Sequence, residues 1–314
     1  MGSGRFRLTT NLFAAALLSL AASTNFASAA DLLLPPPAAP SPVLPAATDP
    51  VTNYFLHWYD RVHEAQATQP HWITPLVTVT PRLEEEIRYD QYWDQLGNGA
   101  QISNFSNGKG LELIPTTTNE VLLNIPAYQE RTIVKPAKGT ADWNFLTVKQ
   151  RLLSANEENG NYILSAFLGF TAPTGAPAFT NKAWIVTPTI AGGFGVGDFD
   201  VQATFGVQIP TAESSIIGTA FATNVAFQYH IFQYFWPEIE INDTAWSGGL
   251  RNGLNQVFLT PGVILGRFPL GAPGVNAIFG VGYQVALNPS PAILTPVLTP
   301  IYNHAWLLSG RVTF

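Results

Sequence analysis

Histidine and cysteine, which often carry catalysis or bind metals, are scarce in this chain. It has five histidines and no cysteine, so disulfides and thiolate chemistry are excluded. His230 and His304 fall at opposite ends of predicted strands, and a separation of about 30 Å rules out one shared Ser/His/acid or Asp/His site. His57, His63 and His71 are spaced so that no pair shares a helix face. We therefore expect no enzyme, no metal site and no cofactor.

Residues 192–197 read Gly-Gly-Phe-Gly-Val-Gly, which superficially resembles a phosphate-binding loop. Such loops connect a strand to the N-terminus of a helix. Here the glycines join two predicted strands and no helix follows. We interpret the stretch as a strand connection.

Charged residues occupy every second position from Arg82 to Asp90. Successive side chains of a strand point to opposite faces, and an Arg or Lys facing lipid at mid-membrane costs roughly 2–4 kcal/mol. We therefore expect the charged face to line a lumen. The predicted lumen-lining residues are Arg82, Glu84, Glu86, Arg88, Asp90, Glu112, Lys149, Arg151, Asp198, Asp200, Glu238, Glu240 and Arg311. Because both signs are interleaved, they would form either a polar channel wall or a salt-bridged network that closes the lumen.

The elements that must position these charges are long strands. Polar and apolar residues alternate strictly from Asp198 to Ile209, which is typical of a strand with one wet face. Such lengths suit tilted membrane strands, whereas globular strands average five to six residues. We place strands near 76–90, 109–115, 119–126, 143–154, 161–171, 183–194, 198–210, 219–231, 232–245, 255–266, 274–288 and 301–314. Their links alternate between short and long, as in bacterial outer-membrane barrels with an even strand count. The expected fold is all-β, a transmembrane antiparallel up-and-down barrel of about 12 strands.

Composition agrees with a membrane barrel. Charged residues make up 11% of the chain and aromatic residues 12%, whereas soluble domains contain about 25% charged residues. No segment after the N-terminal region offers the ~20 continuous apolar residues of a membrane helix. Without Arg5 and Arg7, the 15 basic residues become 13 against 21 acidic ones, a formal charge of −8. No nucleic-acid partner is expected of so acidic a chain.

The N-terminal part divides into three predicted segments. Residues 1–30 have the basic, apolar and small-residue layout of a cleaved signal peptide, which predicts export. Residues 31–50 are a Pro/Ala-rich flexible lead. Residues 51–74 are an amphipathic helix with its connector, and the barrel spans 75–314. The helix would either dock against the barrel mouth as a plug or gate, or rest on the barrel or the inner leaflet.

Aromatic residues fall at the predicted strand ends. Two girdles of such rings mark the water–lipid interfaces of outer-membrane barrels, which makes the bilayer a partner. The predicted interface residues are Trp143, Trp184, Trp246, Trp306, Phe194, Phe199 and Phe314. The alternating final strand ends in Phe314, which is similar to the signal read by the outer-membrane assembly machinery, a second expected partner.

Several short motifs resemble one family. They are Glu157-Glu158-Asn159-Gly160-Asn161-Tyr162, Ala166-Phe167-Leu168-Gly169, Pro173-Thr174-Gly175 and the segment from Asp198 to Pro210. Together they resemble the MetA-pathway of phenol degradation family of outer-membrane proteins, over roughly residues 75–314. The resemblance implies uptake of aromatic or other hydrophobic compounds. It carries over no set of binding residues.

The expected function is that of a porin-like outer-membrane channel. Its partner would be a small-molecule solute that diffuses passively through a polar lumen, with aromatic or hydrophobic compounds as one expected class. The alternative is a structural or adhesive barrel whose lumen is closed and which transports nothing.

Overall fold

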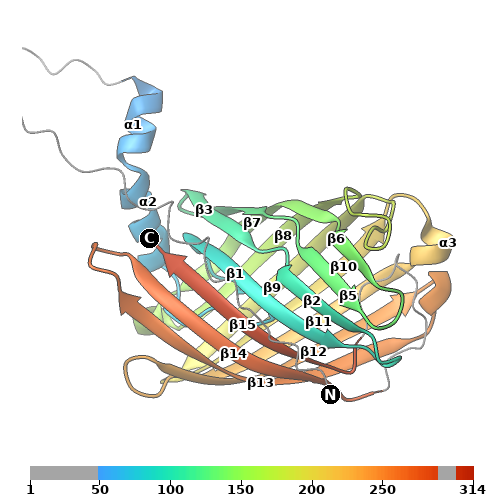
Figure 1. Ribbon diagram of the computed structural model, residues 1–314. Helices are drawn as coiled ribbons and strands as arrows, with labels where there is room; N and C mark the ends of the chain where they lie inside the picture. Colours follow the sequence, from blue (N-terminus) through green and yellow to red (C-terminus); the bar gives the residue numbers. More distant parts are fainter. Residues whose placement is uncertain (1–48, 289–301) are drawn as a thin grey trace, which may run out of the picture. The chain divides into compact units, whose positions relative to one another are not determined.

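A computed structural model describes residues 49–288 and 302–314. The predicted signal peptide and all but the last two residues of the predicted lead lie outside the described residues. In the described part, strands dominate and pair antiparallel throughout. The last strand, β15, pairs with the first, β1, which closes the sheet into a barrel (Figure 1).

The helices are short and the strands are mostly long. The helices are α1 (Pro50–Leu56), α2 (Trp58–Ala67) and α3 (Ser214–Ile217), with 3₁₀ turns η1 (Glu157–Asn159) and η2 (Gly249–Arg251). The strands are β1 (Glu86–Gln95), β2 (Gln101–Ser106), β3 (Gly110–Thr116), β4 (Asn119–Asn124), β5 (Tyr128–Thr132), β6 (Ala137–Thr140), β7 (Trp143–Ala155), β8 (Tyr162–Ala172), β9 (Ile185–Val196), β10 (Phe199–Pro210), β11 (Thr219–Tyr229), β12 (Phe235–Ser247), β13 (Asn255–Pro269), β14 (Asn276–Ala286) and β15 (His304–Thr313).

The fifteen strands make twelve positions around the barrel wall. β1 pairs with β2 along one half and with β3 along the other, so β2 and β3 act as one interrupted strand. β5 continues β4, and β6 continues β7, in the same way. The predicted fold, a closed antiparallel barrel of twelve strands with a short N-terminal helix, is confirmed.

The two faces of the wall have opposite character. Outward side chains such as Phe205, Ile239 and Phe279 are apolar and are 45%, 51% and 55% exposed. Inward ones such as Gln202 and Glu240 are fully buried. This is the strand alternation expected of a barrel with an apolar exterior. Among the described residues, no helix is long and apolar enough to cross a membrane.

The predicted first strand, 76–90, is wrong over most of its length. β1 begins only at Glu86 and runs to Gln95. Pro81 is one reason, because proline cannot donate a ladder hydrogen bond. The links predicted at 91–108 and 127–142 are also wrong in part, since they contain β2, β5 and β6. Those strands continue β3, β4 and β7 along the wall.

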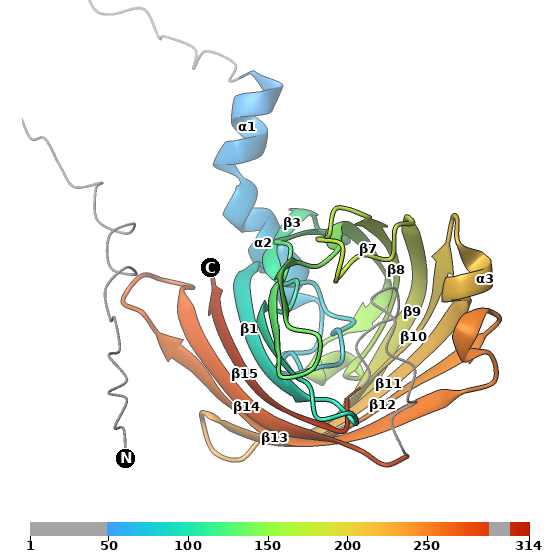
Figure 2. The same cartoon turned by 45° about the vertical axis from the view of Figure 1, so that its right-hand side comes forward.

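The residues before β1 fold into the barrel interior. Residues 69–85, here called the plug, form an irregular chain inside the ring of strands (Figure 2). Ile73 and Leu76 are buried there against inward side chains from β12 to β15, including Trp236, Ile264 and Leu307. The apolar core of the molecule therefore lies within the barrel, around the plug.

Candidate functional site

The plug has no regular structure, so its backbone must find hydrogen-bond partners elsewhere. A buried backbone group left unpaired costs about 1–3 kcal/mol. Two carboxylates on β12 supply acceptors. Glu238 accepts from the Leu76 amide at 3.1 Å, and Glu240 accepts from Val77 and Thr78 at 2.7 and 2.6 Å. Both carboxylates are buried.

Three arginines of the wall supply the matching donors. Arg88 on β1 donates to the Leu76 carbonyl at 2.5 Å, and Arg311 on β15 donates to the Pro75 carbonyl at 2.8 Å. Arg267 on β13 donates to the His71 and Trp72 carbonyls at 2.9 and 2.7 Å. The wall therefore presents carboxylates to plug N–H groups and guanidinium groups to plug carbonyls.

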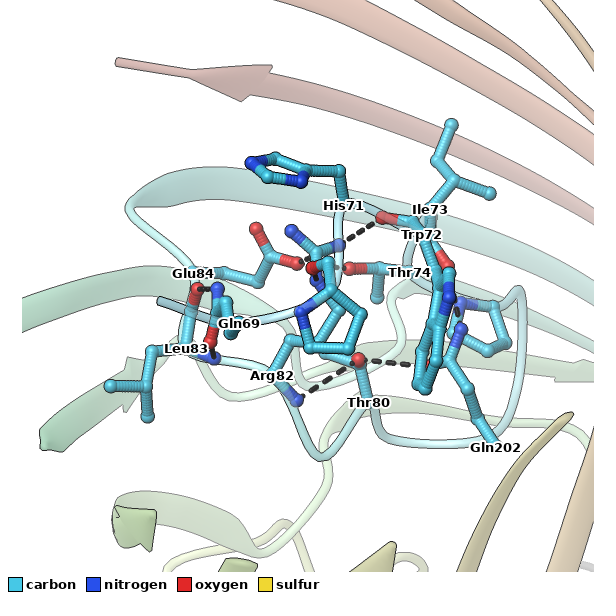
Figure 3. A network of polar contacts seen from close by, with 12 residues as sticks. Gln69, His71, Trp72, Ile73, Thr74, Thr80, Arg82, Leu83, Glu84 and Gln202 are labelled. Carbon is cyan, nitrogen blue, oxygen red and sulfur yellow. Dashed lines mark hydrogen bonds and ion pairs between the residues drawn. The ribbon is translucent and has the colours of Figure 1, made fainter. Parts of the chain in front are cut away.

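Within the plug, Arg82 and Glu84 bind each other and the preceding turn (Figure 3). Their ion pair is 2.9 Å long, and Arg82 also donates to the Pro70 carbonyl at 2.6 Å. Glu84 accepts from the Thr74 hydroxyl at 2.9 Å. The Gln69 amide exchanges two hydrogen bonds with the Leu83 backbone, at 2.8 and 2.9 Å.

The opposite side of the wall also holds the plug. Lys149 on β7 forms a 2.9 Å ion pair with Glu120 on β4 and donates to the Arg82 carbonyl at 2.6 Å. Glu120 in turn accepts from the Glu84 amide at 2.6 Å. Because both ends of the fully buried Lys149–Glu120 pair contact plug backbone, this pair clamps the plug.

Glycines in the wall provide room for two large plug side chains. Leu76 lies against Gly280 and Gly282, and a Cβ added at Gly282 would lie 2.9 Å from it. Trp72 lies against Gly193 of β9, where an added Cβ would be 2.7 Å from the ring. Larger residues at these positions would overlap these plug side chains.

One contact joins the plug to the turn between β7 and β8. The Glu157 carboxylate accepts from the His71 amide at 2.6 Å and contacts the His71 ring nitrogen Nδ1 at 2.7 Å. Partial burial raises the pKa of Glu157, but the hydrogen bonds from His71 outweigh it, so this pKa lies below its ordinary value. The contact is half-exposed, which limits its strength.

Helix α2 docks at the barrel mouth beside the plug. Val62 and Ala65 are buried against Leu83 and Ile114. Arg151 of β7 donates to the Ala65 carbonyl at 2.6 Å, near the helix C-terminus, where cations are favourable. Helix α1 is exposed, with Phe55 at 63%. The second half of the predicted helix therefore packs on the barrel, and its role as a gate stays a prediction.

A cavity of about 630 Å³ lies inside the barrel next to the plug. Most of its wall comes from the strand halves beside the longer links. Amide and hydroxyl side chains predominate, and several bond in a chain across the wall. The Gln284 amide donates to Asn242 at 3.0 Å, Asn242 donates to Asn224 at 3.1 Å, and Asn224 donates to Thr204 at 3.1 Å. Aromatic rings, among them Tyr92 and Tyr302, also line this cavity.

The predicted lumen residues fall into different places. Arg82 and Glu84 belong to the plug, not to a strand. Buried on the wall are Glu86, Arg88, Asp90, Glu112, Lys149, Arg151, Asp200, Glu238, Glu240 and Arg311. The prediction that Asp198 lines the lumen is corrected, because this residue lies exposed in the turn between β9 and β10. That turn takes the residue out of the strand before the inward face begins.

One predicted interface aromatic is also corrected. Trp246 is only 7% exposed and lines the cavity, where Arg251 lies over its ring at 4.8 Å. Exposed side chains of the predicted set are Trp143, Trp184, Trp306, Phe194 and Phe199, and Phe314 is partly exposed. In the part of the chain that the structure describes, no cluster of His, Asp or Glu could hold a metal ion.

Most plug and cavity residues were not predicted from the sequence. Ile73, Leu76 and Thr78 carry no charge and no motif, so nothing marks them individually. A usable signal was present in Pro70, Pro75 and Pro81. Three prolines at such spacing argue against a central strand and reduce the number of backbone N–H groups that need partners.

Geometry and sequence comparison together define the class and the family. The molecule is a twelve-stranded closed barrel with a plug folded into it from the N-terminal side. A family model described as "Putative MetA-pathway of phenol degradation" matches residues 121–290, more than half of the chain. The chain belongs to this family, as the resemblance predicted. No curated protein sequence matches it.

Solved barrels give weaker likenesses. The COG4313 outer membrane channel from Pseudomonas putida F1 is 12% identical, with 72% of this chain and 92% of that chain covered and a TM-score of 0.47. The NanC porin is 7% identical, with 73% and 98% covered and a TM-score of 0.44. The outer membrane protease OmpT from Escherichia coli is 10% identical, with 74% and 94% covered and a TM-score of 0.20. Because these scores are below 0.5, we assign the fold from the strand pairing of this chain.

Proposed function

We propose that this protein is an outer-membrane channel for small molecules. In this proposal the cavity beside the plug, here called the vestibule, binds the solute. The plug closes the lumen on one side of the vestibule. The observation that carries the proposal is the cavity of about 630 Å³ inside a closed barrel with an apolar exterior. A cavity of this volume is in the range that takes one small organic molecule. Passage would be passive and would require the plug to move aside.

The solute class follows from the family and from the cavity wall. The family's description points to phenol degradation, and the rings of Tyr92, Phe258 and Tyr302 offer faces for an aromatic solute. Neutral amide side chains on the same wall can donate hydrogen bonds to, and accept them from, hydroxyl groups of the solute. Export through a cleaved signal peptide and insertion through the C-terminal strand belong to the same proposal.

The second candidate is a barrel that anchors or adheres without transport. The plug favours it, because charged side chains bind the plug on opposite sides of the wall. A permanently closed lumen would make the vestibule irrelevant to passage.

Planar-bilayer recordings separate the two candidates. We would compare the mature chain with a variant that lacks residues 31–84, each first shown to be folded by its heat-modifiable gel mobility. A channel predicts low or intermittent conductance for the mature chain and a large steady conductance for the variant. If neither folded barrel conducts, the transport proposal fails and the closed scaffold stands.

A further inference from the structure

The vestibule wall contains buried acceptor groups that no protein donor satisfies. Asp94, near the end of β1, is 3% exposed, and its Oδ1 has no hydrogen-bond partner among the described residues. Asn104 on β2 is 7% exposed, and its Oδ1 likewise has none in that part of the chain. Both side chains line the cavity.

The two acceptors belong to neighbouring strands. In the β1–β2 register, Asn104 stands opposite Tyr92 and Asp94 stands two residues further along β1, so all three share the inward face. Asn144 on β7, which lines the same cavity, adds a third acceptor without a partner in the described chain. The fully buried side-chain atoms of cavity-lining residues that lack a partner among the described residues are thus three oxygen acceptors.

Aromatic rings line the same cavity as the Asp94 carboxylate, namely Tyr92, Phe258 and Tyr302. Tyr302 packs against the apolar cluster that contains Tyr92, and the Phe258 ring lies 4.7 Å from the Tyr302 ring. The Tyr302 hydroxyl already has a partner, because it donates to the Gln284 carbonyl oxygen. The cavity therefore offers aromatic rings together with a carboxylate, and aromatic faces attract cations.

We propose that Asp94 and Asn104 form a recognition site for the ammonium group of a small aromatic amine. A buried carboxylate without a cation is costly, and a ligand cation with N–H donors would satisfy it. The ring of the amine would pack on Tyr92 and Tyr302, while Asn104 takes a second N–H. This inference rests on the proposed function, since it names a solute class for the same vestibule.

Other charges around the vestibule do not cancel this preference. Arg88 is held by Asp90 at 2.8 Å and by plug carbonyls. Lys109 also lines the cavity and would oppose a cation, but Glu112 lines it as well. Asp142 is occupied by the amides of Gly175 and Asn181, at 3.0 and 2.6 Å.

Calorimetric titration of the full mature barrel in detergent tests the site. The probes are benzylamine, benzyl alcohol and benzoate at neutral pH, where the first is a cation, the second neutral and the third an anion. We expect benzylamine to bind about tenfold or more tightly than benzyl alcohol, the effect of one charge-assisted hydrogen bond, and benzoate not to bind. Asp94→Asn should abolish the difference between amine and alcohol. Asp243→Asn, which removes a β12 carboxylate outside the cavity lining, should preserve it.

Each outcome decides the proposal. Equal binding of amine and alcohol, preferential binding of benzoate, or an unchanged amine preference in the folded Asp94→Asn variant would overturn it. Failure of the channel is visible separately. A barrel that binds benzylamine but never conducts retains the site and loses the transport function, whereas a conducting barrel without amine preference loses only the site.

Discussion

Glu240 is the residue whose replacement tests the plug most directly. Its carboxylate is fully buried and accepts from the amides of Val77 and Thr78 at 2.7 and 2.6 Å. In Glu240→Gln one oxygen remains and an NH₂ group faces the second amide. One charge-assisted bond, about 1.5–3 kcal/mol, is lost, and a buried N–H is left without an acceptor.

The expected change in plug occupancy follows from that loss. If the docking free energy of the plug falls by about 2–3 kcal/mol, the equilibrium between docked and released plug shifts toward the released state by a factor of roughly 30–150. The open probability in single-channel recordings should rise accordingly. Trypsin provides a second readout, because Arg82 is buried in the docked plug and should be cleaved faster once the plug is released.

The matched control is Glu158→Gln. It removes the same charge from an exposed residue of η1 that forms no hydrogen bond or ion pair with the plug among the described residues. It should leave open probability and cleavage at Arg82 unchanged. If Glu240→Gln behaves like this control in a folded barrel, then the Glu240 carboxylate does not hold the plug and the role assigned to it is refuted.

Three further predictions address the wall, the turn and the exterior. Gly280→Ala should raise conductance, because the added methyl group overlaps Leu76, whereas its other neighbours lie 3.5 Å or more away. If this overlap is the cause, Leu76→Ala in the same chain should reduce the increase in conductance. Acidification should weaken the plug contact at Glu157: its folded-state pKa is lowered, so the stabilisation is present above the unfolded pKa of about 4.3 and is lost as the pH falls through the lower folded value. The effect should be under about 1 kcal/mol for so exposed a pair, and Glu157→Gln should remove this part of the pH dependence of open probability in single-channel recordings. Ile239→Arg, on the outward face of β12, should cost up to roughly 2–4 kcal/mol of membrane-inserted stability, whereas Ile239→Val should cost about 1 kcal/mol or less, as measured by urea unfolding in lipid vesicles.

The barrel itself was predictable because period-two alternation survives in several long strands, among them β10, β11 and β14. Asp198 to Ile209 predicted β10 to within one residue at either end. The region before β7 was harder. There the strands are interrupted, as at Asn107 and Gly108, which have positive φ angles of 44° and 69°, so the alternation breaks and the predicted links hide β2, β5 and β6.

The charged face from Arg82 to Asp90 shows why the plug was not predicted. Its alternation is real, but it crosses the point where the chain passes from the lumen into the wall. Arg82 and Glu84 lie on the plug, whereas Arg88 and Asp90 lie on β1. The alternation is the same in the plug and in β1 because the charged side chains of both segments face the polar interior of the barrel. Local periodicity reports which face is wet and cannot report whether the backbone pairs with a neighbouring strand. The backbone of residues 69–85 is satisfied instead by side chains up to 237 positions distant in sequence, and a contact of that separation is set by closure of the barrel, not by any local pattern.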